Sequence, residues 1–277
     1  MKRSLRRSAV VWGFTLIVCF IILWPVYWIV KSSFTDATKL YQMPVRYLPI
    51  NLTLDSYRTL FSYANIRQYF NDTLFIAFAV LLLSVILCAL AGYAFARNNT
   101  KAINLVFVFL LFSTMIPGTV TVIPLIVMWR NLQLTDTFPG LIILYFSMVI
   151  PFSTLMFTGA VKQIPPSVEE AAMIDGTSLV GAFFRVVFPL LRPIMATLCI
   201  LNFIACINEF FTPLMFTSKN LKLMSQLMAN IPRANQYQLP WDTISAAGCL
   251  MLLPTIIFIV CFEKQILEGL MMGSIKQ

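Results

Sequence analysis

Long runs of apolar residues, separated by short polar segments, make up most of the chain. A run of about 20 predominantly apolar residues is long enough to cross a bilayer as one helix. Six segments reach that length: residues 9–30, 73–96, 102–128, 137–161, 193–217 and 243–262. The pattern therefore predicts an all-α membrane protein with six transmembrane helices.

The polar segments define the rest of the organisation. Four basic residues precede the first span: Lys2, Arg3, Arg6 and Arg7. Basic residues beside a first span favour a cytoplasmic N-terminus. The first apolar run is too long for a signal peptide and has no cleavage site after it, so we expect it to be retained. The predicted divisions are an N-terminal segment (1–8), a transmembrane domain (9–262) containing a cytoplasmic loop (162–192), and a cytoplasmic tail (263–277).

Composition and charge exclude several classes of function. Of the 277 residues, 59% are hydrophobic and only 11% are charged, which fits a multi-pass membrane protein and not a soluble domain. The net charge of +9 is scattered over short loops. Nucleic-acid binding would need basic residues gathered on one face, so we expect a lipid membrane and no nucleic acid.

Residues suited to metal binding or catalysis are scarce. The six cysteines all lie in predicted spans without a CxxC pair, and the sequence has no histidine. We therefore expect no metal site, no disulfide framework and no catalytic residues. The GxxxxGK[ST] phosphate-binding sequence is also absent, so the chain is not expected to hydrolyse ATP itself. An intramembrane enzyme is excluded on the same grounds, because no GxSxG-type site is present.

The loop between the fourth and fifth spans has helix signals of its own. Ser167 and Glu170 have the spacing of a capping box, and Gly176 follows Asp175 where a helix would end. Ser178 can cap a second helix. The apolar residues of that second helix fall on one predicted face, at Leu179, Phe183, Val186 and Leu190. The loop is therefore predicted to be helix, tight turn, helix, closed by Pro189 and Pro193.

This loop resembles the EAA motif of permease subunits of bacterial ABC importers. The family pattern is EAA followed by a glycine and, about a dozen residues further on, a proline. Glu170-Ala171-Ala172, Asp175-Gly176 and Pro189 match it here. Gly269-Leu270, Gly273 and Lys276 resemble the GLxxGAVK tail of the maltose-type second permease subunit. Nearly the whole chain is similar to the permease subunit of a carbohydrate ABC importer, of the type of the smaller maltose permease.

The resemblance implies a fold, a function and a set of partners. The fold is that of a type I ABC importer permease in a bacterial plasma (inner) membrane, with both termini cytoplasmic. The partners are a homologous second permease, two copies of a P-loop ATPase that bind ATP and Mg, and an extracytoplasmic substrate-binding protein. The tail residues would approach the ATPase. A coupling helix would contact the ATPase through Glu169, Glu170, Ala171, Ala172, Asp175, Gly176 and Pro189.

Glu209 is the only charged residue well inside a predicted span, and Asn208 precedes it. A carboxylate in hydrocarbon is costly, so it should face a cavity or a partner helix. We therefore consider both a packing role and a place on the translocation path. Asn208-Glu209-Phe210 resembles the Trp-Asn-Glu/Asp-Phe sequence of sugar-type permeases, except that Ile207 replaces the tryptophan. The alternative function is an ion-gradient-driven secondary transporter that uses Glu209.

Overall fold

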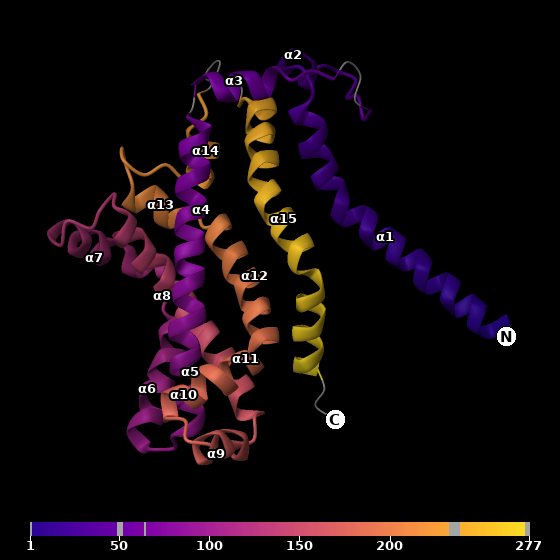
Figure 1. The fold of residues 1–277 in the computed structure, drawn as a ribbon. Helices are drawn as coiled ribbons and strands as arrows, with labels where there is room; N and C mark the ends of the chain where they lie inside the picture. The colour runs from indigo at the N-terminus through magenta and orange to yellow at the C-terminus, as the bar shows by residue number, and fades with distance from the viewer. Residues whose placement is uncertain (1, 49–51, 64, 233–238, 275–277) are drawn as a thin grey trace. The chain divides into compact units, whose positions relative to one another are not determined.

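The computed structural model describes residues 2–48, 52–63, 65–232 and 239–274, and these residues form helices, turns and loops without a strand. The chain divides into two compact units. Unit 1 comprises residues 1–67 and 227–253, and unit 2 comprises residues 68–226 and 254–277. Figure 1 follows the chain from α1 to α15.

Unit 1 contains α1 (Lys2–Ser33), α2 (Ala37–Leu40), α3 (Asp55–Tyr63), most of α14 (Met224–Asn230) and the first part of α15 (Trp241–Ser274). Two side-chain hydrogen bonds hold α3 in this unit. The Ser56 hydroxyl donates to Oδ2 of the buried Asp242 at 3.2 Å, and the Tyr57 hydroxyl donates to Oγ of Ser33 at 3.0 Å.

Unit 2 contains most of the remaining helices, and it holds both candidate sites. Its elements are α4 (Ile66–Leu83), η1 (Ser84–Cys88), α5 (Ala89–Arg97), α6 (Lys101–Phe112), η2 (Ser113–Met115), α7 (Gly118–Asn131), α8 (Phe138–Lys162), α9 (Pro166–Ile174), α10 (Leu179–Ala182), η3 (Phe183–Val187), α11 (Phe188–Leu190), α12 (Arg192–Asn208) and α13 (Phe211–Phe216).

Four described helices are long and apolar enough to cross a membrane: Val11–Ser33, Ile66–Arg97, Phe138–Lys162 and Trp241–Phe262. Two bent pairs raise the number to six if each pair counts as one span. The pairs are Lys101–Met115 with Val120–Asn131, bent by 106°, and Leu179–Leu190 with Arg192–Asn208, bent by 73°. The all-α membrane fold is therefore confirmed.

Two predicted spans are broken in the structure. The segment 102–128 is interrupted after Met115, where Ile116 is extended and Pro117 precedes the first turn of α7. The segment 193–217 is interrupted at Glu209, which has extended backbone between α12 and α13. Proline restricts the residue before it to extended conformations, which accounts for the first break. Apolar composition alone predicted continuous helices in both places.

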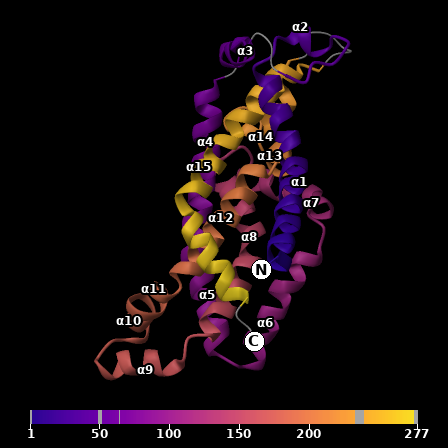
Figure 2. The ribbon, with the colours of Figure 1, turned by 90° about the vertical axis from the view of Figure 1, so that its right-hand side faces the viewer.

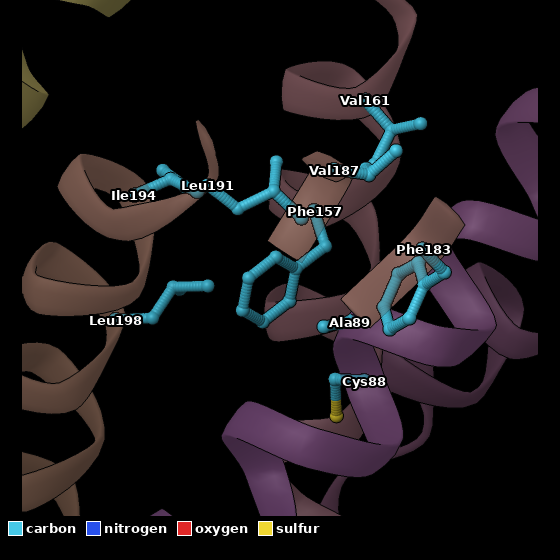
Figure 3. Packing of buried hydrophobic residues seen from close by; sticks show 9 residues of the cluster. All are labelled: Cys88, Ala89, Phe157, Val161, Phe183, Val187, Leu191, Ile194 and Leu198. Atoms are coloured by element: carbon cyan, nitrogen blue, oxygen red, sulfur yellow. The ribbon is translucent and has the colours of Figure 1, made fainter. Parts of the chain in front are cut away.

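A cluster of buried side chains joins η1 and α5, α8, η3 and α12 in unit 2 (Figure 3). Its members are Cys88, Ala89, Phe157, Val161, Phe183, Val187, Leu191, Ile194 and Leu198. Gly92 allows α5 and α8 to pack closely, because a Cβ there would lie 2.6 Å from Cβ of Phe157 and 2.9 Å from the backbone nitrogen of Thr158. Small residues at such contacts are typical of helix packing in membranes.

The predicted apolar face of the second loop helix is only partly correct. Phe183 is 2% exposed, but Leu179 and Leu190 are 58% and 53% exposed. Leu179 lies in α10, before the π-helical turn η3. After Phe183 that turn shifts the buried face, because its i→i+5 bonding places more residues in a turn than the 3.6 of an α-helix. The shift buries Val187 and Leu191 in place of the residues predicted from a regular period.

Candidate functional site

The loop after α8 forms a helical arm, residues 166–190, which comprises α9, α10, η3 and α11. Figures 1 and 2 show α9 at the opposite end of unit 2 from the first turns of α4, with α10 and α11 leading back beside α5. The predicted helix, turn and second helix are therefore present. The predicted capping box is not, because α9 already begins at Pro166 and Ser167 lies within its first turn. Proline suits the first helical position because it needs no N–H partner there.

A glycine turn separates α9 from α10. The N–H of Gly176 donates to the carbonyl of Met173 at 3.0 Å, and the N–H of Thr177 donates to that of Ala172 at 3.1 Å. These two bonds define a Schellman motif with Gly176 at the left-handed position, where its φ is +89°. Ser178 then caps α10, as predicted, by accepting from the N–H of Gly181 at 3.1 Å.

The two adjacent glutamates of the motif point to different surroundings. Glu169 is 5% exposed, and its two carboxylate oxygens are both occupied within the chain. Oε1 accepts from Nε of Arg97 at 2.8 Å and from Nη2 of the same guanidinium, and Oε2 accepts from the hydroxyl of Tyr93 at 2.7 Å. Nη2 of Arg97 also donates to the carbonyl of Ile164 at 2.8 Å. Glu169 therefore ties α9 to the last turns of α5.

The outer surface of the arm is exposed and partly apolar. Glu170, Ala171 and Asp175 are exposed, and Ile174 has 86% of its surface accessible. At the start of α10, Leu179 and Val180 are 58% and 64% exposed. Apolar residues gathered beside charged ones on an exposed surface mark an interaction site. Pro189 lies in α11, away from this surface in the sequence, and is half-buried.

Glu209 lies at the wall of a cavity of about 690 Å³ in unit 2. Its Oε1 accepts from the N–H of Thr212 at 2.7 Å and from the Thr212 hydroxyl at 2.8 Å, so the carboxylate caps the short helix α13. Residues from η2, α7, α8 and α13 form the other walls. The adjacent Asn208 is exposed but does not line the cavity. Of the two residues predicted for a translocation path, Glu209 lines this cavity and Asn208 does not.

The residue before Asn208 faces the protein core. Ile207, which replaces the tryptophan of the similar sequence in sugar-type permeases, is 3% exposed. Its side chain therefore cannot stack on a ligand in this structure. Phe211 lines the cavity and supplies an aromatic ring instead.

A buried polar cluster connects three helical elements of unit 2, and the sequence did not indicate it. The amide Nδ2 of Asn202 donates to Oγ of Ser84 at 3.1 Å and to Oγ of Ser153 at 3.0 Å. The three side chains are 3%, 1% and 0% exposed, respectively. Hydrogen bonds between helices stabilise packing where no water is available. Each residue is an isolated polar position in an apolar run, so no local pattern reveals the cluster.

Asp136 organises the loop that follows α13, and the sequence did not indicate this either. Its Oδ1 accepts from the N–H groups of Ser218 and Leu221, both at 3.1 Å, and its Oδ2 accepts from those of Lys219 and Asn220, both at 2.9 Å. Burial alone would raise the pKa of Asp136, but the four backbone donors outweigh it and hold the pKa well below 3.8. The contacts join residues more than 80 positions apart, which no local pattern predicts.

Replacing Asp136 with alanine should release this loop. The four N–H groups lose a charged acceptor, and hydrogen bonds to charged groups contribute about 1.5–3 kcal/mol each. We expect hydrogen–deuterium exchange at Ser218–Leu221 to accelerate by roughly tenfold or more. Because the folded pKa is depressed, the contribution is present above pH 3.8 and is lost only as pH falls well below that value.

The matched control is Asp55→Ala. Asp55 pairs with Arg58 at 3.2 Å, but both side chains are largely exposed. An exposed ion pair contributes little to stability, so hydrogen–deuterium exchange of the backbone amides around Asp55 should change little in this variant. Unchanged exchange at Ser218–Leu221 in the Asp136 variant would show that the loop is held by other contacts.

The remaining predicted site residues are at the C-terminal end. The backbone of α15 is helical through Gly269, Leu270 and Gly273, and Lys276 lies outside the described residues. Among the residues that the structure describes, no group of three side chains could hold a metal ion.

Comparison with known proteins gives consistent matches. The sequence model of the family described as "Binding-protein-dependent transport system inner membrane component" matches residues 89–266. The sulfoquinovosyl glycerol transport system permease protein of Agrobacterium fabrum is 32% identical over 92% of this chain and 89% of its own length. The trehalose transport system permease protein of Mycobacterium tuberculosis is 30% identical over 98% of both chains.

A solved structure has the same fold. It is a bacterial ABC transporter involved in the import of the acidic polysaccharide alginate, and the match covers 95% of this chain and 97% of that one. The TM-score is 0.77 at 21% identity. The matched family region contains the arm, the Arg97–Glu169 pair and the cavity residue Glu209.

Proposed function

Because the chain belongs to the family of binding-protein-dependent transport system inner membrane components, we propose that it is the permease subunit of an ATP-driven importer for sugars or oligosaccharides. The family match over residues 89–266 carries this proposal. The relatives are named for carbohydrates, which include the uncharged trehalose and the sulfonated sulfoquinovosyl glycerol, and these names support carbohydrate as the substrate class. The chain itself forms half of the translocation path.

The arm couples the permease to a separate ATPase that binds ATP and Mg. Its exposed surface, formed by Glu170, Ala171, Ile174 and Asp175 together with the start of α10, supports this role. Alanines allow a partner backbone to approach closely, and the carboxylates can accept charge-assisted hydrogen bonds from basic groups. Glu169 has a different role: it holds α9 on α5, so that force on the arm reaches the spans.

Two copies of the ATPase, a homologous second permease and an extracytoplasmic binding protein complete the proposed importer. A second solved alginate transporter, at a TM-score of 0.68, is in complex with a periplasmic protein that carries an alginate pentasaccharide. That arrangement supports a binding protein as a partner. Movement of the arm with the ATPase would tilt the spans as rigid bodies. The translocation path would then open alternately to the two sides of the membrane.

The proposed location is the bacterial plasma membrane, with both termini and the arm in the cytoplasm. The four basic residues at the start of α1, ahead of its apolar span, support this orientation, because positive charge is retained on the cytoplasmic side. The last turns of α15, with Gly269 and Leu270, would then lie on the same side as the ATPase. The family membership disfavours the gradient-driven alternative for Glu209.

Co-purification tests the proposed function. The tagged chain, isolated from its host in mild detergent, should carry a P-loop ATPase, a second permease and a binding protein, all identifiable by mass spectrometry. Recovery of the chain alone or only as a homo-oligomer across several detergents would contradict the importer and favour a gradient-driven transporter.

Ile174→Glu should weaken attachment of the ATPase without affecting the second permease. Burial of an isoleucine side chain contributes about 1.5–3 kcal/mol, so its replacement by a charge should reduce ATPase recovery at least tenfold. Met43→Glu is the matched control, because Met43 is also 86% exposed but lies in unit 1, outside the arm. Equal ATPase recovery from the Ile174 variant and the control would remove Ile174 from the coupling surface.

A further inference from the structure

The cavity beside Glu209 has an unusual balance of hydrogen-bonding groups. Five hydroxyl side chains line it, and each donates its proton within the chain. Ser113, Thr114, Thr121 and Ser147 donate to the carbonyls of Leu110, Leu111, Gly118 and Leu144, respectively, at 2.6–3.0 Å, and Thr212 donates to Glu209. A hydroxyl that has used its proton offers only lone pairs to a ligand. The hydroxyl side chains of the wall therefore present acceptors.

Glu209 adds charge to the same wall. Its Oε1 is occupied by Thr212, while within the described part of the chain Oε2 accepts no hydrogen bond. Among the described residues that line the cavity, none is Lys or Arg. The cavity thus carries one negative charge with no cation beside it.

The size and the apolar lining of the cavity suit a small ligand. Its volume of about 690 Å³ falls within the roughly 300–1,000 Å³ of typical small-molecule sites. Phe211, Leu125, Leu144 and Met148 add apolar surface to the wall.

We propose that this cavity binds an uncharged polyhydroxyl compound and rejects anionic ones, with Glu209 as the residue that determines this selectivity. This inference rests on the proposed function, because it treats the cavity as part of the substrate path. A saccharide brings many O–H donors, which match a wall of acceptors. The free Oε2 of Glu209 can take the strongest of these bonds, because a charged acceptor strengthens a hydrogen bond.

An anion meets the opposite situation. A carboxylate, sulfonate or phosphate needs donors or a cation to replace its water, and the described side chains of the wall include no Lys or Arg and no hydroxyl with an unused proton. It would also lie near the like charge of Glu209, and repulsion between two unit charges grows as the surroundings become less polar than water. The preference for uncharged ligands over anions therefore has two sources: repulsion between Glu209 and an anion, and hydrogen bonds that the wall accepts from an uncharged ligand.

Charged thiol reagents test the selectivity at the cavity itself. Ser147→Cys places a thiol on the wall with a one-atom change, in a complete importer complex whose native cysteines have been replaced. The complex is treated with methyl methanethiosulfonate and with its anionic sulfonatoethyl and cationic trimethylammonioethyl forms. The rate at which each reagent modifies the introduced thiol is divided by its rate with a free thiol in solution. After this normalisation, the cationic form should react about tenfold faster than the anionic form.

The matched variants separate Glu209 from the rest of the protein. The reference variant is Ser62→Cys, which places the thiol on exposed α3. Glu209→Gln removes the charge but keeps an oxygen for Thr212. When it is added to Ser147→Cys, the ratio of the cationic to the anionic rate should come close to the ratio measured at Ser62→Cys. A ratio at Ser147→Cys that already equals the ratio at Ser62→Cys, a ratio unchanged by Glu209→Gln, or no reaction with any reagent would each overturn the proposal. The first comparison needs no change at Glu209, so it stands even if that variant fails to assemble.

The ligand retained by the co-purifying binding protein gives an independent check. Mass spectrometry should identify it as an uncharged saccharide or polyol, and an anionic ligand would overturn the selectivity assigned to Glu209. Failure of the proposed function gives a different result, the absence of an ATPase from the purified complex. The two failures are therefore distinguishable.

Discussion

Glu169→Ala should abolish most ATP-driven transport while the chain still inserts in the membrane. The substitution leaves the Arg97 guanidinium, whose side chain is 16% exposed, without its carboxylate partner, and the Tyr93 hydroxyl without its acceptor. Breaking a buried ion pair from one side costs about 3–5 kcal/mol. The loss falls on the contact that holds α9 against α5, so the arm can no longer transmit movement to the spans.

Glu170→Ala is the matched control, because it removes the neighbouring carboxylate from an exposed position. Thermal unfolding and substrate-stimulated ATP hydrolysis are measured for both variants in the reconstituted complex. Glu169→Ala should lower the unfolding midpoint and uncouple hydrolysis from transport, whereas Glu170→Ala should leave the midpoint unchanged. An unaltered midpoint in Glu169→Ala would mean that the buried pair does not hold the arm.

The double variant Arg97→Met with Glu169→Met separates two causes of the lost stability. One is the burial of an unpaired Arg97 charge, and the other is the loss of the attraction between Arg97 and Glu169. Replacing both members of a buried pair with apolar side chains is often close to neutral, because no charge remains buried without a partner. We expect the double variant to recover much of the stability lost in Glu169→Ala. Destabilisation as large as in the single variant would show that the pair contributes a net attraction of its own.

Gly176→Val should also abolish uptake and leave the membrane spans intact. The backbone of Gly176 has φ +89°, a conformation that a β-branched residue adopts only under strain. A Cβ at this position would meet no atom within 4 Å, so the expected defect comes from the backbone and not from crowding. The strained turn would misdirect α10 relative to α9 and displace the surface that meets the ATPase.

A graded series at Gly176 checks this cause. Asparagine tolerates positive φ better than alanine, and alanine better than valine, so uptake should fall in that order. Gly159→Ala is the control, since Gly159 lies within α8 and a Cβ there also meets nothing within 4 Å. Uptake by Gly176→Val at the level of the Gly159 control would contradict a coupling role for the turn.

Local signals in the arm were largely readable from sequence. Gly176 and Ser178 act on backbone groups within five residues of themselves, and the predicted turn and the predicted cap are both present. Ser167 was misread because Pro166 also suits a helix start, and the chain uses that residue. The buried face of the second helix was misread because a π turn changes its period.

The partners of Glu169 could not be predicted from its neighbours. Glu169 and Glu170 are adjacent and chemically identical, yet one is buried against Arg97 and the other is exposed. The difference depends on which side of α9 faces α5, and residues 72 positions away in the chain determine that. Glu209 was singled out correctly as an unusual charge, but its cavity and the burial of Ile207 depend on the break between α12 and α13.

The sequence by itself determined the four long apolar helices, the position of the arm directly after α8, and the glycine turn at its tip, but not the breaks within the segments 102–128 and 193–217. Each of these follows from burial of apolar length in lipid or from hydrogen bonds between close neighbours. Only the tertiary structure decided that Glu169 is a tether within the chain, that Asp136 holds a distant loop, and that the hydroxyls around Glu209 present acceptors. A buried polar group must find a partner in the folded protein, and packing between helices selects that partner.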